Sequence, residues 1–482
     1  MKALVWIQRE FRIDYLESLQ NALCEADEVI VAYFHDKAQT IGDANTVWLT
    51  MALEQLKADY QKLGADIWIL SGSFETIFET LLRQENIQKV YYCFQVGEPF
   101  TSQRNLALSV CQRNKVKLKP SFSEFWFAPD QIHNLQGKPY LVFTPFYKTL
   151  MKQIHRLEPL DTTQQNNLSK LLLPPKIHAT LPADLKQISQ TAWAKKLLTH
   201  WQIGETPAWQ IFNDFLLHKI SEYNELRDYP AHDATSRLSP YLHFGHLPAR
   251  QLYFETQSFL LELPNKREVS QAWLRQLIWK EFARHLLFWF PHTQTQPFQS
   301  KYIQMPWNNE ADEESVIAIK AWQQGLTGIP IIDAGMRELW ETGTMHNRVR
   351  MLVASFLTKN LNLHWLIGQK WFDETLLDAD PANNAMGWQW VAGCGVDAAP
   401  YYRLFNPVRQ SIKFDADGTY LRHWLPEVAP LSNKAIHQPW EYKDECLEKH
   451  IILGKTYPSP IINLPASQQE HKNRVGSLKA IK

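Results

Sequence analysis

The fold is decided by the stretch DADPANNAMGWQW at residues 378–390. It is preceded by MHNRVRM at residues 345–351 and followed by GCGVDAAPYYRLFNP at residues 393–407. Indoles stand here beside carboxylates, amides and guanidiniums, a mixture that few ordinary cores need. A buried site for a large, flat, partly charged heteroaromatic cofactor does need that mixture.

The composition predicts a soluble protein of two domains. A chain of 482 residues with 45% hydrophobic content can build two cores. Lys+Arg and Asp+Glu are 50 each, so no global basic excess indicates nucleic acid, although a local groove can be basic on a neutral protein. Five scattered cysteines form no CxxC pair, and the N-terminus turns polar at Gln8, too soon for a signal peptide or membrane span. We therefore expect a cytoplasmic monomer without a metal site.

The pattern along the chain divides it into an α/β part and a helical part. Up to residue 125, β-branched and aromatic runs at 3–7, 29–34, 67–70 and 90–94, with a helix at 47–63, predict a parallel, Rossmann-like sheet. No dinucleotide fingerprint or P-loop is present, so this part could be purely structural. Residues 126–200 are interpreted as a linker, 201–465 as an all-helical domain, and 466–482 as a polar tail that frays. Helical spacing is found at 207–223, 269–290, 313–324, 330–342 and 345–361.

Taken in this order, the motifs Met-His-Asn-Arg, Asp-x-Asp, Asn-Asn, Trp-Gln-Trp, Asp-Ala-Ala-Pro-Tyr and Arg-x-Phe-Asn-Pro resemble the photolyase and cryptochrome family. Within it, the chain is most like the photolyases that act on cyclobutane pyrimidine dimers. The resemblance covers the C-terminal half and thins toward the N-terminus. It implies an α/β N-terminal domain, a long linker and an all-α domain that binds FAD. A second antenna chromophore, a reduced folate or a deazaflavin, is left unassigned, because the opening signature here reads REFR at residues 9–12.

The resemblance implies an FAD site built from several segments. The segment 235–239, TSRLS, resembles a pyrophosphate cradle, while its sequence alone predicts a helix start with Ser239 as the N-cap. Arg350 and Asp378 match a pair that lies against the flavin ring, or they form a buried ion pair with no role in the chemistry. The implied FAD-binding residues are Tyr223, Thr235, Ser236, Arg237, Leu238, Ser239, Trp273, Lys280, Arg350, Asp378, Asp380 and Asn384.

Four positions bear on the lesion. Photolyases for cyclobutane dimers carry Glu where this chain has Gln276 and Arg where it has Lys280, and Gln276 resembles the (6-4) photoproduct enzymes. The (6-4) enzymes, however, place histidines where this chain has Asn347 and Met351, so these two residues favour the cyclobutane dimer. His346 is interpreted as structural. The implied contacts to DNA are Gln276, Trp279, Asn347, Arg348, Met351 and Trp390, with Trp279 and Trp390 flanking a flipped-out dimer.

Three tryptophans match the family's electron relay from flavin to surface. These are Trp388, Trp365 and Trp307, and each of them taken singly could be ordinary core packing. Asn384 matches the residue that faces N5 of the flavin, where a neutral amide favours reduced flavin. Trp388, Trp365, Trp307 and Asn384 are therefore the implied catalytic residues.

The resemblance implies a light-driven enzyme that repairs UV-damaged DNA, a deoxyribodipyrimidine photo-lyase. Two alternatives remain open at this point. A cryptochrome photoreceptor that binds FAD without repair is favoured by Gln276, Lys280 and the altered N-terminal signature. A (6-4) photolyase is supported by Gln276 alone.

Overall fold

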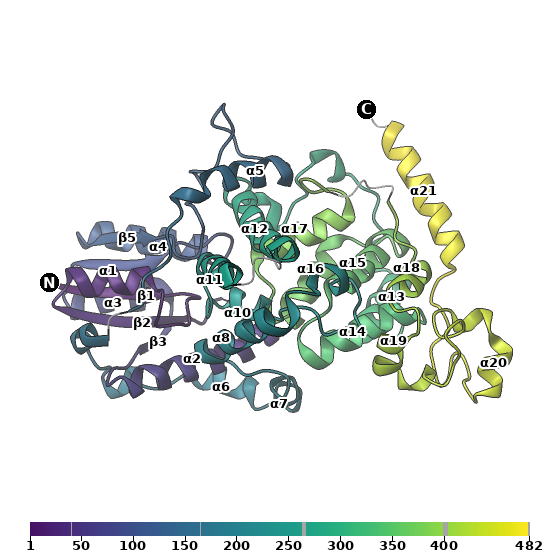
Figure 1. Ribbon diagram of the computed structural model, residues 1–482, viewed down its shortest axis with the longest axis horizontal. Coiled ribbons are helices and arrows are strands. Elements are labelled where there is room, and N and C mark those ends of the chain that lie inside the picture. The colour runs from purple at the N-terminus through teal and green to yellow at the C-terminus, as the bar shows by residue number, and fades with distance from the viewer. Residues whose placement is uncertain (40, 164, 263–266, 399–402, 481–482) are drawn as a thin grey trace. The chain divides into compact units, whose positions relative to one another are not determined.

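The computed structural model describes residues 1–39, 41–163, 165–262, 267–398 and 403–480 (Figure 1). The chain forms two compact units. Unit 1 comprises Met1–Ser221, Ser236–Pro291 and Leu377–Asn383, and unit 2 comprises Glu222–Thr235, His292–Leu376 and Asn384–Lys482. Unit 1 thus contains all of the predicted α/β part and the predicted linker. The motif at residues 378–390 is shared between the two units.

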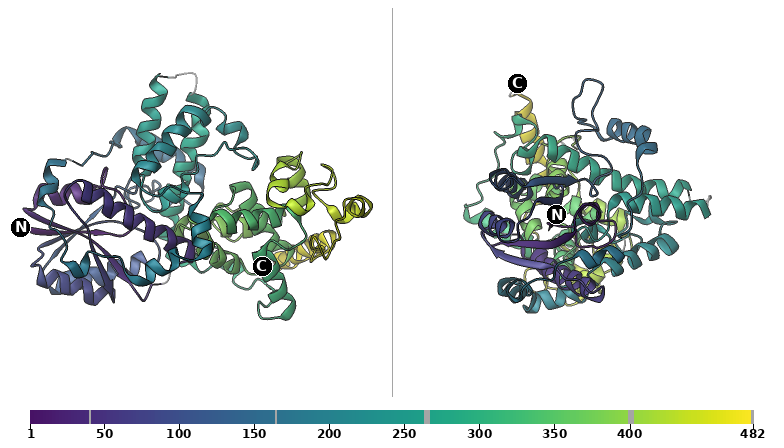
Figure 2. Two further views of the ribbon diagram at one scale, coloured as in Figure 1. Left: turned by 90° about the horizontal axis from the view of Figure 1, so that it is seen from below. Right: turned by 90° about the vertical axis from the view of Figure 1, so that its left-hand side faces the viewer.

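The N-terminal part of unit 1 is a five-stranded parallel sheet, as the sequence predicts. Its strands are β1 (Lys2–Ile7), β2 (Glu28–Asp36), β3 (Trp68–Gly72), β4 (Lys89–Cys93) and β5 (Lys117–Ser121), in the order β3-β2-β1-β4-β5. Figure 2 shows helices on both sides of these strands. The helices between the strands are α1 (Glu17–Glu25), α2 (Asp43–Lys62), α3 (Phe74–Gln84) and α4 (Phe100–Arg113).

The fifth strand was missed by the sequence analysis. Strand β5 reads KLKPS, and of its five residues only Ser121 is buried. It lies at the edge of the sheet, paired with β4 alone. An edge strand that faces solvent carries no apolar run, so its composition resembles that of a loop.

The rest of unit 1 is helical. The predicted linker contains the helices α5 (Phe143–Gln153), α6 (Ala183–Ser189) and α7 (Ala192–Leu198). Beyond it lie α8 (Glu205–Asp214), which continues as a π-helical turn at Phe215–Lys219, then α10 (Ser239–His243), α11 (Ala249–Glu262) and α12 (Arg267–Trp289).

Unit 2 is also helical. Helices α13 (Glu313–Gln324) and α14 (Pro330–Thr342) have the bounds that the apolar spacing predicts. The predicted helix at 345–361 is α15 (Asn347–Ser355) followed by a π-helical turn at Phe356–Asn360. The other elements used below are α9 (Tyr223–Leu226), α16 (Trp365–Thr375), α18 (Pro407–Phe414) and α19 (Thr419–Trp424), with α17 (Pro381–Ala392) beginning in unit 1.

The C-terminal segment corrects one expectation. Instead of fraying, it forms the helix α21 (Leu464–Ala480). Ser467 and His471, four residues apart, are both buried, and Oγ of Ser467 accepts a hydrogen bond of 2.9 Å from Nδ2 of Asn360. Arg474 donates to the carbonyl oxygen of Lys359 at 2.8 Å. These two polar contacts attach the helix to the π-helical turn, although its sequence has little apolar periodicity.

Among the residues described, no helix is both long and apolar enough to cross a membrane.

Candidate functional site

The polar centre of unit 1 is a buried ion pair between Arg9 and Asp380. Nη2 of Arg9 donates to Oδ2 of Asp380 at 3.0 Å, and the side chains are 9% and 6% exposed. Nε of Arg9 donates to the carbonyl oxygen of His243 at 2.7 Å. The other carboxylate oxygen, Oδ1, accepts from the backbone N–H groups of Ala382 and Asn383 at the start of α17. Asp380 is therefore fixed in position by Arg9, in the segment that follows β1, and by the helix that Asp380 precedes.

Three cations determine the charge of Asp380. Burial alone would raise its pKa, but the charges of Arg9, Arg284 and Lys280 outweigh burial and hold the pKa well below the usual range. Lys280 itself is half-buried on α12, where burial first and the charge of Arg284 second lower its pKa to about 8. The sequence placed Asp380 and Lys280 at the cofactor, and the structure brings both into one electrostatic cluster.

Sequence reasoning missed the N-terminal part of this cluster. Arg12 is completely buried, forms an ion pair with Glu124 and donates to the carbonyl oxygen of Gly245 at 2.7 Å. Arg284 donates to the carbonyl oxygen of Glu124 at 2.7 Å. The segment REFR at residues 9–12, expected only to be a drifted antenna signature, thus joins the sheet to α10 and α12. A signal was available, since two arginines and a glutamate directly after a buried strand need buried partners.

Helix α12 carries four of the predicted site residues. Trp273 is buried against Phe215, with ring centroids 4.9 Å apart. The Gln276 side chain is half-buried and donates to the carbonyl oxygen of Ala272 on its own helix at 3.4 Å. Trp279 stacks on Phe143 with centroids 3.6 Å apart and an interplanar angle of 5°. One face of Trp279 is therefore occupied by Phe143.

The residues of the predicted pyrophosphate cradle are assigned to different units and are described separately. Tyr223 and Thr235 belong to unit 2, and residues 236–239 belong to unit 1. Arg237 has φ of 54° and lies over the ring of Trp201, while Leu238 is buried. The expectation that Ser239 is an N-cap is wrong. Ser239 is the first helical residue of α10, because Leu238 before it already has helical dihedrals, and Leu238 has no side chain that could cap.

In unit 2, the amide of Asn384 is held in one orientation. Its Nδ2 donates to Oδ1 of Asp373 at 2.7 Å and to the carbonyl oxygen of Gln369 at 3.2 Å. Burial raises the pKa of Asp373 to about 6, so this carboxyl is mostly ionised at pH 7 and can accept. The carbonyl oxygen of Asn384 has no hydrogen bond to any residue that the structure describes. It is the part of this side chain that is left to accept a hydrogen bond from a ligand.

The three tryptophans of the predicted relay lie in two ring clusters of unit 2. Trp388 is buried and packs on α16 so closely that a methyl group added to Gly368 would lie 2.0 Å from its ring, and it contacts Phe372 at 5.0 Å between centroids. Trp365 begins the same helix and contacts the ring of His364 at 5.5 Å. His364 in turn contacts the half-exposed Trp307 at 5.4 Å. In the described part of the chain, no ring contact joins Trp365 directly to Trp388.

In the segment around α15, some side chains bind other groups of the protein and others are exposed or half-buried. His346 is the N-cap of α15, where Nδ1 accepts from the backbone of Arg348 at 3.2 Å, and burial lowers its pKa to about 4. This agrees with its structural interpretation. Arg348 forms a 2.7 Å ion pair with Asp228. Asn347 is exposed and Met351 is half-buried.

The remaining predicted residues are placed as follows. Nε of Arg350 donates to the carbonyl oxygen of Met345 at 2.7 Å in unit 2. Asp378 lies in unit 1 and is half-buried. Trp390 is half-buried near the end of α17, and its ring contacts no other ring among the described residues. Residues 399–401 of the Asp-Ala-Ala-Pro-Tyr motif lie outside the described part of the chain. The described residues hold no group of His, Cys, Asp and Glu arranged to bind a metal ion.

Comparisons with known proteins identify the family of this chain. Residues 3–165 match a family model described as DNA photolyase, and residues 273–477 match one described as the FAD binding domain of DNA photolyase. A deoxyribodipyrimidine photo-lyase from Agrobacterium fabrum is 37% identical over 466 residues, which cover 95% of this chain and 94% of that protein.

Two crystal structures have the same fold over nearly the whole chain. A bacterial class III photolyase from Agrobacterium tumefaciens is 33% identical with a TM-score of 0.90, covering 99% of this chain and 98% of that one. A cryptochrome from Synechocystis sp. is 27% identical with a TM-score of 0.88, covering 98% of both chains. This chain belongs to the DNA photolyase and cryptochrome family, and its C-terminal half carries the FAD-binding domain.

Proposed function

We propose that the protein repairs UV-damaged DNA by splitting cyclobutane pyrimidine dimers in light, with FAD as its cofactor. Reduced FAD, when bound, supplies the light-driven electron that opens the cyclobutane ring. The similarity to a deoxyribodipyrimidine photo-lyase along 95% of the chain supports this proposal. The observation that carries it furthest is the fixed amide of Asn384.

The orientation of Asn384 fits a reduced flavin. With its NH₂ group bound to Asp373, the side chain presents an acceptor and no donor. N5 of a reduced flavin carries a proton and donates, whereas N5 of an oxidised flavin can only accept. Asn384 would therefore stabilise the reduced form, which is the form that repair needs. A titrating carboxylic acid at this position would not make that distinction.

The charges of unit 1 fit the polar parts of FAD. Asp380 keeps its negative charge at all ordinary pH values and can accept from the N–H groups of the flavin's polar edge. Lys280, with no hydrogen bond to another described residue, is available to an anionic group. Trp273 would border the ring. These residues would bind and orient the cofactor and exclude water from it.

The DNA side of the site is supported by two aromatic side chains. Trp390 has no ring partner among the described residues, and Trp279 has one covered face. Stacking on such indoles offsets the few kcal/mol that extruding a dimer costs. Asn347 and Met351 provide neither of the two histidines that the resemblance associates with (6-4) repair, so we place the cyclobutane dimer first. The protein would act as a monomer in the cytoplasm.

A blue-light photoreceptor that binds FAD without repair is the second candidate. The similarity to the Synechocystis cryptochrome favours it. So does the uncharged Gln276, because it replaces the acidic residue that the dimer-repairing relatives are expected to carry.

Binding of damaged DNA in the dark separates the two candidates. The FAD-loaded protein would be titrated into three duplexes of one sequence, carrying a cyclobutane dimer, a (6-4) photoproduct or no lesion. Repair of dimers predicts at least about a hundredfold preference for the first duplex over the third, equal to about 2.7 kcal/mol. Trp390→Ala should reduce this preference, while Trp424→Ala, outside the proposed site, should leave it. Equal affinity for all three duplexes would contradict repair, and preference for the second would identify the (6-4) class.

A further inference from the structure

Residues 131–157 of unit 1 form a basic segment in a chain of balanced charge. They contain three lysines, one arginine and no aspartate or glutamate, whereas the whole chain has 50 residues of each sign. The basic residues are Lys138, Lys148, Lys152 and Arg156, and all four are exposed. Charge of one sign is common on solvated surfaces, so the structure around these residues decides what they can bind.

Helix α5 aligns two of these cations on its exposed side. Lys148 and Lys152 are four residues apart, so they lie on one face of the helix, about 6 Å apart along its axis. The opposite side of α5 is buried, and it includes Phe146 and Phe143, which stacks on Trp279 of α12. Figure 1 shows α5 beside α12. The helix is therefore attached by its apolar side and presents its basic side to solvent.

Lys138 lies in a hydrogen-bonded turn before α5. Oδ1 of Asn134 accepts from the backbone N–H groups of Gln136 and Lys138 at 2.9 Å and 3.0 Å. The backbone N–H of Asn134 donates to the carbonyl oxygen of Lys138 at 2.8 Å. The segment between β5 and α5, to which this turn belongs, projects from unit 1 (Figure 1). The turn thus holds a further cation out in solvent.

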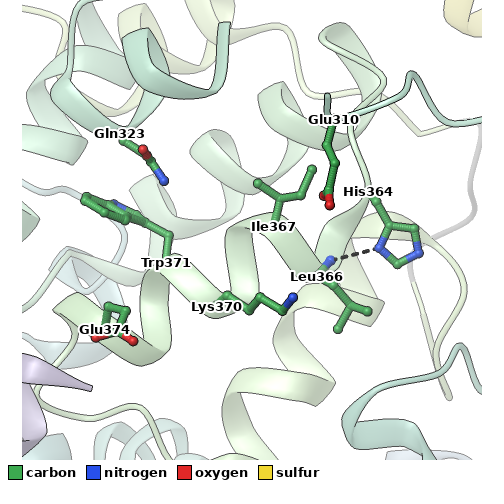
Figure 3. A pocket seen from close by; sticks show the side chains of 8 residues that line it. All are labelled: Glu310, Gln323, His364, Leu366, Ile367, Lys370, Trp371 and Glu374. Atoms are coloured by element: carbon green, nitrogen blue, oxygen red, sulfur yellow. Dashed lines mark hydrogen bonds between the residues drawn. The ribbon is translucent and has the colours of Figure 1, made fainter. Parts of the chain in front are cut away.

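The ammonium groups of this segment are not neutralised by neighbouring carboxylates. The side chains of its three lysines form no hydrogen bond or ion pair with any residue that the structure describes. Other exposed lysines have acidic neighbours, such as Lys62, whose Nζ is 2.7 Å from Oδ1 of Asp59. Lys370 lines a pocket of about 520 Å³ beside α16 together with Glu310 and Glu374 (Figure 3). The single sign of residues 131–157 therefore gives a positive potential that attracts an anionic partner.

Arg275 joins this surface to the residues of α12 that are expected to contact DNA. It is exposed, and its guanidinium carbon lies over the rings of Phe143 and Tyr147 of α5, 4.9 Å and 5.3 Å from their centroids. Gln276 follows it in the sequence, and Trp279 lies four residues further along the same side of α12. The basic side of α5 is thus continuous with the part of α12 that faces a base in the proposed function.

We propose that residues 131–157 and Arg275 form an arm that binds the phosphates of duplex DNA outside the lesion. Phosphate contacts position a duplex and supply affinity without carrying sequence information. The arm therefore strengthens binding to damaged and undamaged DNA equally, and lesion preference comes from the residues around the flipped base. The inference rests on the proposed function for its partner, DNA, and it does not depend on which lesion is repaired.

An anionic membrane surface is the alternative partner for a segment that is both basic and partly apolar. Leu135, Leu141 and Val142 of the projecting segment are exposed. A helix that lies on a membrane, however, buries its apolar face among the lipids. The apolar side of α5 is already covered by α12, since Phe143 stacks on Trp279. This covered face and the continuity with α12 favour DNA.

The test removes two charges of α5 in the variant Lys148→Gln/Lys152→Gln. Glutamine and lysine have similar helix propensities, and both positions are exposed, so the fold should be kept. The matched control is Lys186→Gln/Lys195→Gln, at exposed positions of α6 and α7, on the other side of unit 1 from α5 (Figure 1). Both variants change the net charge by the same amount. The full-length, FAD-loaded proteins are titrated in the dark, at several salt concentrations, with an undamaged duplex and with the same duplex carrying a cyclobutane dimer.

We expect the α5 variant to bind both duplexes at least about tenfold more weakly at about 0.1 M salt, with an unchanged ratio of the two affinities. The slope of log affinity against log salt concentration should become shallower by about 1.8, or about 0.9 for each lost phosphate contact. The control should bind like wild type. An equal loss of affinity in both variants would overturn the arm, because net charge alone would then explain it, and so would a loss confined to the damaged duplex.

The undamaged duplex keeps this test separate from the proposed function. Equal affinity of wild type for the two duplexes would contradict lesion repair, while the α5 variant would still decide the arm. A wild type that binds neither duplex at low salt would overturn the arm. Vesicles of phosphatidylcholine and phosphatidylglycerol test the alternative partner, and we expect no cosedimentation with wild type. Cosedimentation that is lost in the α5 variant, with DNA affinity unchanged, would replace DNA by a membrane surface.

Discussion

Replacing Arg9 with leucine tests the buried cluster that the sequence did not reveal. The substitution removes the guanidinium that donates to Asp380 at 3.0 Å and to the carbonyl oxygen of His243 at 2.7 Å. Asp380 then stays charged and buried, with only the more distant cations Arg284 and Lys280 to balance it.

The size of the effect follows from burial. Both partners of the ion pair are less than a tenth exposed, so solvent screens their interaction weakly. Removing one partner of such a pair costs about 3–5 kcal/mol, because the other charge is left uncompensated. Since Arg284 and Lys280 remain near Asp380, we expect a loss in the lower half of this range. In Arg9→Leu/Asp380→Asn no charge is stranded, so the double variant should recover more than about 1 kcal/mol of that loss.

Urea unfolding of the four proteins of this double-mutant cycle gives the coupling energy directly. Arg113→Leu is the matched control, because Arg113 pairs with Glu75 at 2.9 Å on the surface and is 46% exposed, so its unfolding midpoint should barely move. The lowered pKa of Asp380 also determines how the contribution of this ion pair to stability changes with pH. Because the folded-state pKa of Asp380 is depressed, the pair stabilises the protein above pH 4 and this contribution fades as pH falls through the folded-state pKa. The proposed coupling in this cluster would be refuted if the losses of unfolding free energy in the two single variants added up to the loss in the double variant. It would also be refuted if Arg9→Leu lost no more unfolding free energy than the control Arg113→Leu.

Three further predictions concern the helices and the cofactor. Gly368→Ala should destabilise by about 1–3 kcal/mol in thermal unfolding, because the new methyl would lie 2.0 Å from Trp388, whereas Gly387→Ala, with open space around its added methyl, should stabilise slightly. Since the pKa of Lys280 is lowered to about 8, its charge is lost as pH rises through 8. If that charge contributes about 1.4 kcal/mol to FAD binding, FAD affinity should fall by about tenfold between pH 7 and 9.5. Lys280→Arg should make FAD affinity independent of pH, and a wild-type affinity that does not change with pH would contradict this role of Lys280. Trp388→Phe should abolish photoreduction of oxidised flavin while FAD stays bound, and photoreduction at the wild-type rate would refute its place in the relay.

Apolar periodicity predicted those elements of the fold that bury a face. The first four strands of the sheet were predicted from β-branched and aromatic runs, and helices α13 and α14 from their apolar spacing. Strand β5 was missed because its exposed lysines leave no such pattern. Helix α21 was missed because its attachment depends on Ser467 and Arg474, polar residues whose partners are distant in the sequence.

The predicted site residues came from motif order, and the structure adds partners that no motif contains. Arg9 is 371 residues from Asp380 in the sequence, and no local pattern relates the two. Asp373 orients Asn384 from the preceding helix, and Phe143 in the predicted linker covers one face of Trp279. Partners of this kind depend on the tertiary fold, so a single sequence shows only that the buried polar groups must have them.

The most direct test of the proposed function is repair itself. Photoreduced, FAD-loaded protein would be mixed with an oligonucleotide that carries one cyclobutane thymine dimer, illuminated with blue light, and the restored thymines counted against a dark control. The account predicts complete restoration in light, none in the dark, and none for an oligonucleotide with a (6-4) lesion. An unrepaired dimer, with FAD bound and fully reduced, would contradict the account and favour the photoreceptor.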